Sequence, residues 1–281
     1  MMELILAIFT IIILGIASWI DLKTREVPDY LSYVLISGGL ILRLILALYT
    51  GNYKELIWLP ISLVIIFTFS YFMYSSGQWG GGDVKIMTGL AIIMSYRANN
   101  NFFPFFADFF INMLIVGTIY GIIMMSIKAI KNFKEFKEEL SKLDLILLII
   151  LIIVITLIVN WFRNLPSIMI LMLFALLGSF SLKYLRIIER KLMKENIPVT
   201  KLTEGDWITE NIKLNGKVVI PKRKIGIALE DLNFIKKNFK KFSKMKVQVK
   251  VGIPFVPTFF LAYVTTLILG NLLYKILILS I

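Results

Sequence analysis

The sequence predicts a polytopic α-helical membrane protein of six to eight transmembrane helices with a small α+β cytoplasmic domain. Of its 281 residues, 58% are hydrophobic and only 17% are charged, whereas a soluble protein carries about 25% charged residues. The apolar residues also gather in runs long enough to cross a bilayer. One long polar segment, residues 183–250, interrupts these runs, and we expect it to lie outside the membrane.

A transmembrane helix needs about 20 mostly apolar residues. Eight runs approach this length, at residues 4–20, 31–49, 56–74, 84–95, 109–127, 145–161, 167–182 and 255–279. The fourth run has only twelve residues, so it is the weakest span. It could either continue irregularly through residues 96–103 or be partly buried in protein. The first run follows Met1 without a basic segment or a small-residue cleavage site, and we interpret it as a retained span.

Lysine and arginine predict the orientation, because they accumulate in cytoplasmic loops. With the N-terminus outside, the cytoplasmic connections are residues 21–30, 75–83, 128–144 and 183–250. The connection 128–144 carries five lysines, and the polar segment carries eighteen lysines and arginines. The net charge of +13 therefore faces the cytoplasm, where it favours anionic lipid headgroups, and we expect no nucleic-acid partner.

The polar segment should fold as a basic cytoplasmic domain. We expect helices over residues 184–196 and 230–246, with short strands between them and a hairpin at Asn215-Gly216. The expected division of the chain is then a membrane domain with paired aspartates, an additional transmembrane hairpin, the basic domain and a C-terminal transmembrane helix, over residues 1–130, 131–182, 183–250 and 251–281.

The composition restricts the available chemistry. The chain has no cysteine and no histidine, which excludes disulfides, thiol nucleophiles, Ser-His-Asp catalysis and the usual nitrogen and sulfur ligands of zinc. We expect neither a metal nor a cofactor. Catalysis, if present, must use carboxylates, hydroxyls, lysine or the backbone.

Two aspartates are functional candidates, because a carboxylate near the bilayer is energetically unfavourable. Asp21 ends the first run and Asp83 begins the fourth, so the topology brings both to the cytoplasmic edge. Two carboxylates in a partly desolvated site can share a proton, since each negative charge opposes ionisation of the other. One can then activate water while the other polarises a carbonyl group, which gives peptide hydrolysis. In the alternative interpretation, Asp83 only caps its helix and Asp21 pairs with Lys23 or Arg25.

The segment "GQWGGGDVK", residues 77–85, favours the catalytic interpretation. Gly80, Gly81 and Gly82 accept positive φ and let another backbone approach closely, so this loop could close over a substrate. Lys85 could lower the pKa of Asp83 or contact the substrate. In the alternative interpretation, its side chain only extends its charge to the membrane–water interface.

Four further residues have ordinary interpretations. We expect Trp79 to anchor the chain at the membrane interface and Asp108 to be solvated at the outer end of a span. Pro254 and Pro257 indicate a kinked helix start, with substrate-binding irregular backbone as the alternative.

These motifs resemble the type IV prepilin peptidases, in particular the archaeal prearchaellin (preflagellin) and prepilin peptidases, which are GxGD membrane aspartyl proteases. The GxGD letters fall on Gly80, Gly82 and Asp83, and "WIDLKTREVPD" at residues 19–29 resembles the family's first aspartate and its proline-containing turn. The main resemblance covers residues 1–130, while "LTEGDW" and "VGIPFVPTFFLAY" resemble the C-terminal portion of the archaeal enzymes. It implies that Asp21 and Asp83 are the catalytic pair.

The resemblance implies a multi-pass protein of the cell membrane whose active site faces the cytoplasm. Its substrates would be prearchaellin or prepilin-like precursors, from which it removes the short basic leader. Bacterial members carry paired CxxC zinc motifs, which this chain lacks. Two other functions stay open: a presenilin- or signal-peptide-peptidase-like intramembrane protease, and a proton- or cation-coupled transporter that uses the same aspartates.

Overall fold

The computed structural model describes residues 2–96, 105–139, 142–161, 172, 193–214, 216–222 and 226–279. The chain divides into two compact units. The first comprises Met1–Thr118 and Glu195–Asn271, and the second comprises Ile119–Lys194 and Leu272–Ile281. Each unit is described by itself.

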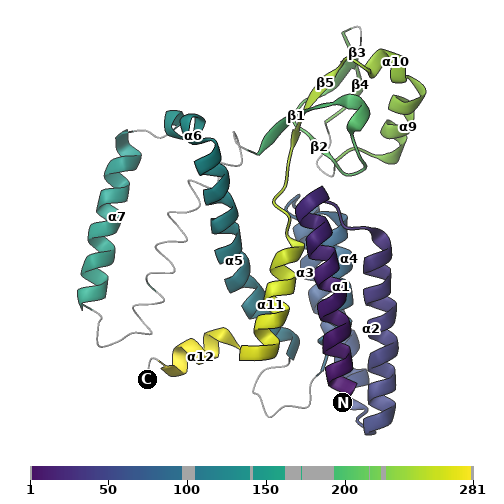
Figure 1. Ribbon diagram of the computed structural model, residues 1–281, viewed down its shortest axis with the longest axis vertical. Coiled ribbons are helices and arrows are strands. Elements are labelled where there is room, and N and C mark those ends of the chain that lie inside the picture. The colour runs from purple at the N-terminus through teal and green to yellow at the C-terminus, as the bar shows by residue number, and fades with distance from the viewer. Residues whose placement is uncertain are drawn as a thin grey trace. The chain divides into compact units, whose positions relative to one another are not determined.

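The first unit contains a bundle of apolar helices (Figure 1). These are α1 (Met2–Thr24), α2 (Asp29–Thr50), α3 (Lys54–Ser75), α4 (Gly81–Ile93), the first part of α5 (Phe105–Lys131) and α11 (Val256–Leu269). In the described part of the chain, four helices are long and apolar enough to cross a membrane, over Met2–Thr24, Asp29–Thr50, Leu56–Ser75 and Phe105–Lys131. The helices therefore support the predicted membrane class. They do not decide the predicted number of six to eight spans, because the described residues leave out almost all of the run 167–182.

Helix α4 is the short member of this bundle, as its twelve-residue apolar run predicted. It has 13 residues, so it is about 20 Å long at 1.5 Å per residue. From Ile86 onward nearly all its residues are apolar and buried, and it packs against α2 and α3. Glycines allow the close contact with α2: a Cβ atom on Gly89 would lie only 2.9 Å from the Leu35 side chain.

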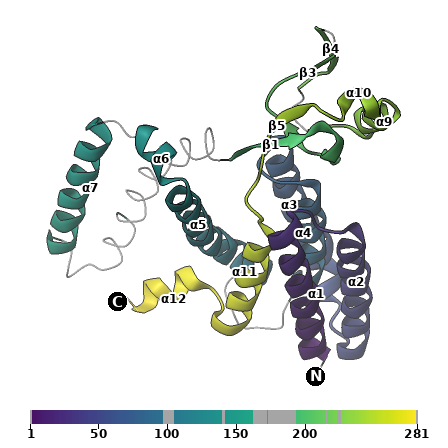
Figure 2. The ribbon, with the colours of Figure 1, turned by 45° about the horizontal axis from the view of Figure 1, so that its top comes forward.

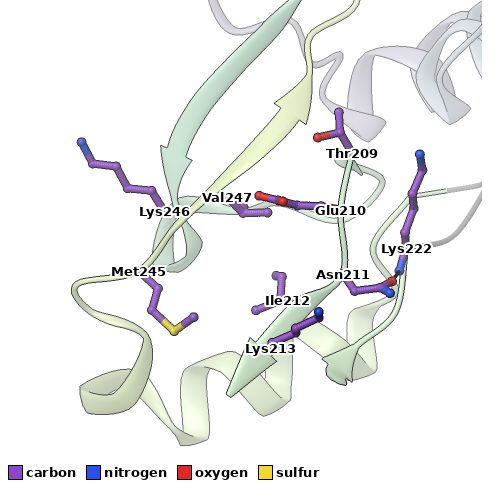
Figure 3. A pocket seen from close by; sticks show the side chains of 9 residues that line it. All are labelled: Thr209, Glu210, Asn211, Ile212, Lys213, Lys222, Met245, Lys246 and Val247. Carbon is purple, nitrogen blue, oxygen red and sulfur yellow. Dashed lines mark hydrogen bonds between the residues drawn. The ribbon is translucent and has the colours of Figure 1, made fainter. Parts of the chain in front are cut away.

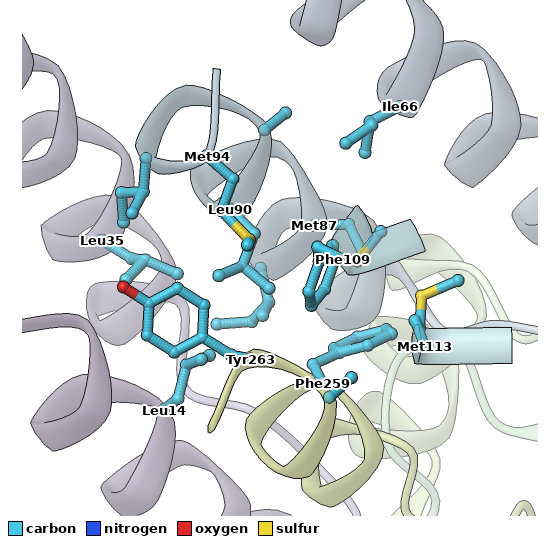
Figure 4. Close-up of a cluster of buried hydrophobic side chains, with 14 of the residues drawn as sticks. Leu14, Leu35, Ile66, Met87, Leu90, Met94, Phe109, Met113, Phe259 and Tyr263 are labelled. Atoms are coloured by element: carbon cyan, nitrogen blue, oxygen red, sulfur yellow. The ribbon is translucent and has the colours of Figure 1, made fainter. Parts of the chain in front are cut away.

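The core of the bundle is built from large side chains of several helices. Figure 4 shows Leu14 of α1, Leu35 of α2, Leu90 and Met94 at α4, Phe109 of α5, and Phe259 and Tyr263 of α11 gathered around one centre; all are fully buried or nearly so. This packing places α11, which is distant in sequence, against α1 and α4.

Residues 194–250 form a small α+β region with its own core (Figure 2). Its elements are β1 (Lys194–Pro198), the 3-10 turn η2 (Val199–Lys201), β2 (Trp207–Ile208), β3 (Ile212–Leu214), β4 (Lys217–Ile220), α9 (Leu229–Lys237), α10 (Phe239–Phe242) and β5 (Lys246–Lys250). The sheet order is β1-β5-β2, while β3 and β4 form a separate antiparallel hairpin. The pairing of Leu214 with Lys217 confirms the hairpin predicted at Asn215-Gly216. The described end of the helix predicted over residues 184–196 is instead strand β1, because it pairs with β5.

The second unit contains the rest of α5, α6 (Phe133–Glu139), α7 (Lys142–Trp161) and α12 (Leu272–Leu279). Helix α7 corresponds to the first arm of the predicted additional hairpin. The second predicted arm, residues 167–182, lies outside the described residues apart from Met172. The apolar run 255–279 is divided into α11 and α12 at Gly270, whose φ of 68° and ψ of −142° do not continue a helix.

Candidate active site

Asp21 lies near the end of α1 and is only 5% exposed. Its Oδ2 atom accepts a hydrogen bond of 3.0 Å from the backbone N–H of Val256, the first residue of α11. The first N–H groups of a helix have no partner within the helix, so this end of α11 supplies a donor to the carboxylate. The two basic neighbours have other partners: Lys23 lies over the Trp19 ring, and Arg25 pairs with Glu195. The predicted alternative, an ion pair of Asp21 with one of them, is therefore not what the structure shows.

Asp83 lies in the first turn of α4, outside the four candidate spans. Its Oδ2 atom accepts the N–H of Gly80 at 2.9 Å, so Asp83 does cap its helix. Burial raises the pKa of Asp83 from 3.8 to about 7; the Gly80 hydrogen bond opposes this rise, and the negative charge of Asp21 adds to it. Capping and proximity to a second carboxylate thus occur together at Asp83, although they were predicted as alternatives.

The two segments that carry the aspartates also contact each other. Val27, in the turn that follows Asp21, packs against Gly82, where a Cβ atom would lie 3.2 Å from the Val27 Cβ atom. Helix α11 packs against both α1 and α4. The structure therefore brings together the segment "WIDLKTREVPD" and the glycine-rich segment "GQWGGGDVK".

The three glycines are used differently from the prediction. Gly80 is extended, with φ of −79° and ψ of 164°, and Gly81 and Gly82 begin α4. The glycine of this segment with positive φ is Gly77, at 72°. In this conformation Gly82 is needed for its small size rather than for its backbone freedom, because a side chain there would meet Val27.

Lys85 is directed toward α2. Its Nζ atom lies 2.6 Å from Asp29 Oδ1 and 5.7 Å from the centre of the Tyr33 ring. The ion pair therefore links α4 to the start of α2. Asp29 is the partner of Lys85 in this state, and we assign the lysine no direct effect on Asp83.

Of three other residues, two lie in surroundings that were not predicted and one lies where it was expected. Trp79 is 3% exposed and packs against Phe69, Phe255 and Phe259, so it belongs to the core and is not an interfacial anchor. Asp108 is likewise 3% exposed and accepts a hydrogen bond from Asn271, so the prediction of a solvated carboxylate is wrong. Pro257 lies in the first turn of α11, as a helix-start proline should.

The contacts between the α+β region and the turn after Asp21 were not predicted from the sequence. Thr203 Oγ1 donates a hydrogen bond of 2.7 Å to Glu26, and Arg25 lies 3.3 Å from Glu195. Burial raises the pKa of Asp206. The hydrogen bonds with Thr203 oppose this rise, and the negative charge of the nearby Glu26 adds to it. The "LTEGDW" segment therefore lies beside the Asp21 turn. Because about 170 residues separate the partners, no local sequence signal could have predicted these contacts.

A cavity of about 540 Å³ lies elsewhere, in the α+β region. It is lined by residues 209–213 and Lys222 on one side and by residues 245–247 on the other (Figure 3). Neither aspartate of the pair lines it. Among the described residues, no group of acidic side chains has the arrangement of a metal site.

The part of the chain that holds both aspartates is similar to known proteins. Residues 8–125 match the model of the Type IV leader peptidase family. The predicted resemblance to the leader peptidases is thus confirmed for residues 8–125. The leader peptidase match includes Asp21, the three glycines and Asp83, and it leaves the α+β region and α11 outside.

Two curated relatives are similar to the same part. The chain is 38% identical over 82 residues to the preflagellin peptidase of Methanococcus voltae, and 35% identical over 83 residues to that of Methanocaldococcus jannaschii. Each alignment covers 29% of this chain and 35% of the relative's length. No solved structure matches the chain at a significant level.

Proposed function

We propose that the protein is an aspartyl endopeptidase that removes the short basic leader of preflagellins or type IV pilin-like precursors. The observation that carries this proposal is the pair of carboxylates itself. Asp21 and Asp83 come from two separate motifs of the matched segment, and the negative charge of Asp21 adds to the rise in the pKa of Asp83. The relatives named preflagellin peptidase support the choice of substrate class.

The two aspartates take different roles because their surroundings differ. With its pKa raised to about 7, Asp83 retains its proton in a large share of molecules at neutral pH. Asp21 keeps the Val256 N–H as a donor to its ionised oxygen. We therefore assign Asp21 as the base that takes a proton from water, and Asp83 as the acid that polarises the scissile carbonyl group. The proton held by Asp21 then passes to the leaving amine.

The location of cleavage follows from the distribution of basic residues. The turn after α1, the connection after α5 and the α+β region carry most of the lysines and arginines, which favours a cytoplasmic position for this edge of the bundle. Both aspartates lie at helix ends of this edge, beside the α+β region. A substrate would therefore present its leader to the site from the cytoplasm, with its own apolar helix still in the bilayer.

The decisive experiment is cleavage of purified preflagellin and prepilin precursors by the full chain in detergent, with sequencing of the new N-terminus. Asp21→Asn and Asp83→Asn should each lower the rate by at least about 100-fold, because each removes a group that transfers or holds a proton. Asp108→Asn is a matched control, since Asp108 is also a buried aspartate of the bundle and bonds Asn271 beyond the far end of α11.

Three results would contradict the proposal. Undiminished cleavage by either mutant would remove that aspartate from the site. A new N-terminus within the apolar helix of the precursor would instead indicate intramembrane cleavage. Proton or cation flux in liposomes, without cleavage of any precursor, would indicate a transporter.

A further inference from the structure

We propose that Arg43 of α2 and Ser62 of α3 are positioning residues that hold the C-terminal end of α4 and thereby set the position of Asp83 at its other end. This inference rests on the proposed function, in which Asp83 is catalytic. It concerns residues that touch neither aspartate.

Helix α4 ends inside the protein, so the carbonyl groups of its last turn need hydrogen-bond donors other than water. The hydrocarbon core of a bilayer is about 30 Å thick, whereas a helix of 13 residues is about 20 Å long. Its last residues, Ala91 to Ile93, and the following Met94 and Ser95 are all buried. The last four carbonyl groups of a helix have no partner within it, and leaving them unsatisfied away from water is strongly unfavourable.

The structure accounts for each of these four carbonyl oxygens. Two accept backbone N–H groups of the following turn: Leu90 from Met94 at 2.8 Å, and Ile92 from Ser95 at 3.3 Å. The other two are satisfied by side chains from neighbouring helices. Ser62 Oγ donates to the Ala91 oxygen at 2.9 Å, and Arg43 donates to the Ile93 oxygen through Nε at 2.8 Å and also through Nη2. The end of α4 is therefore capped by α2 and α3 together.

The burial of Arg43 indicates that this cap is a specific feature. Arg43 is 3% exposed in the middle of a candidate span, where a charged side chain is unfavourable unless it has partners. Its positive charge complements the negative end of the α4 dipole. Gly39, one turn earlier in α2, permits the approach, since a Cβ atom there would lie 2.7 Å from the Ile93 side chain.

A cap at one end of α4 affects the other end because the helix is rigid and closely packed. Residues 86, 87 and 89–93 are buried between α2 and α3, so loss of the cap lets the helix slide along its axis rather than bend. A shift by one residue is about 1.5 Å. Misplacement of a catalytic group by about 1 Å can lower a rate by about 100-fold.

Two serines of α3 provide a matched test. Ser62 and Ser70 are both completely buried, but Ser70 Oγ bonds Ile66 of its own helix at 2.7 Å, whereas Ser62 also bonds α4. In cleavage assays with the full chain and a preflagellin precursor, we expect Ser62→Ala to lower kcat about tenfold with little change in KM. Ser70→Ala should keep both parameters within about twofold of wild type. Ser62→Thr, which restores a hydroxyl donor, should recover part of the lost kcat.

The pH profile separates positioning from a loss of folded protein. If Asp83 moves away from Asp21, the alkaline limb of kcat/KM shifts to lower pH in Ser62→Ala and in Arg43→Gln, because the charge of Asp21 acts on it less. A smaller folded fraction would reduce the amplitude and leave the limb in place. Should Arg43→Gln fail to fold, the two serine variants decide the question.

The proposal is overturned if Ser62→Ala matches Ser70→Ala in kcat and in the position of the alkaline limb. That result would leave the proposed function intact, provided that Asp83→Asn is inactive in the same assay. If the wild-type protein cleaves no precursor, the proposed function itself fails.

Discussion

At the scale of single residues, Asp83 is the group whose surroundings most affect its chemistry. It caps α4 through Gly80, yet the carboxyl group is also partly removed from water and faces the charge of Asp21. The first contact favours its ionised form, and the other two favour its protonated form. Because desolvation is the largest of these, the group titrates near neutrality rather than near pH 4.

Folding stability should reflect this raised pKa. Between the unfolded value of 3.8 and the folded value of about 7, the folded state holds a proton that the unfolded state has lost. The stability contributed by Asp83 is therefore complete below pH 4 and decreases as pH rises through 7. We expect the melting temperature of Asp83→Asn, relative to wild type, to increase between these pH values and then to level off. Thermal unfolding at several pH values measures this difference, and a constant difference would contradict the assigned pKa.

At the scale of elements, the critical contact is between the start of α4 and the turn after α1. Gly81 and Gly82 are adjacent and both lie in the first turn of α4, but only Gly82 faces Val27. A side chain on Gly81 would meet nothing within 4 Å, whereas one on Gly82 would push against the turn that follows Asp21. The two glycines therefore differ in what they do, which agrees with the GxGD pattern, where Gly82 is a fixed glycine and Gly81 is the variable position.

Alanine substitutions should separate these roles. Gly82→Ala should lower the cleavage rate about tenfold or more and destabilise the fold by about 1–3 kcal/mol, as overpacking does. Gly81→Ala should be neutral or slightly stabilising, because alanine is the better helix former by up to about 1 kcal/mol. Cleavage kinetics and thermal unfolding measure both effects. Adding Val27→Ala to Gly82→Ala should restore part of the activity, and equal effects of the two single substitutions would refute the assigned contact.

At the scale of the whole molecule, the first unit joins the helical bundle to the α+β region near Asp21. Strand β5 leads through residues 251–255 into α11, whose first N–H binds Asp21. Thr203 and Glu195 of the α+β region contact Glu26 and Arg25 in the turn after α1. The α+β region is thus connected to the site once through the chain and once through side chains.

The sequence predicted those features that depend on local composition. The apolar runs indicated α1, α2, α3 and α5, and for the short fourth run the structure agrees with one of the two predicted alternatives, a helix partly buried in protein. The placement of Asp21 and Asp83 at helix ends also followed from these runs. In contrast, the partners of Arg43, Lys85 and Thr203 depend on packing between distant segments. Strand β1 was predicted as helix for the same reason, since its pairing with β5 has no signal within the strand itself.

The contact between Thr203 and Glu26 provides the test at this scale. A hydrogen bond to a charged carboxylate is stronger than a neutral one, whereas the exposed Arg25–Glu195 ion pair should contribute little. Thr203→Val should therefore lower kcat/KM about threefold to tenfold by releasing the turn after Asp21, with Thr203→Ser close to wild type. Thr209→Val is the control, because Thr209 bonds Gln248 within the α+β region. Steady-state cleavage of a precursor measures the effect. Equal activity of Thr203→Val and Thr209→Val would show that the α+β region does not help to hold the catalytic turn.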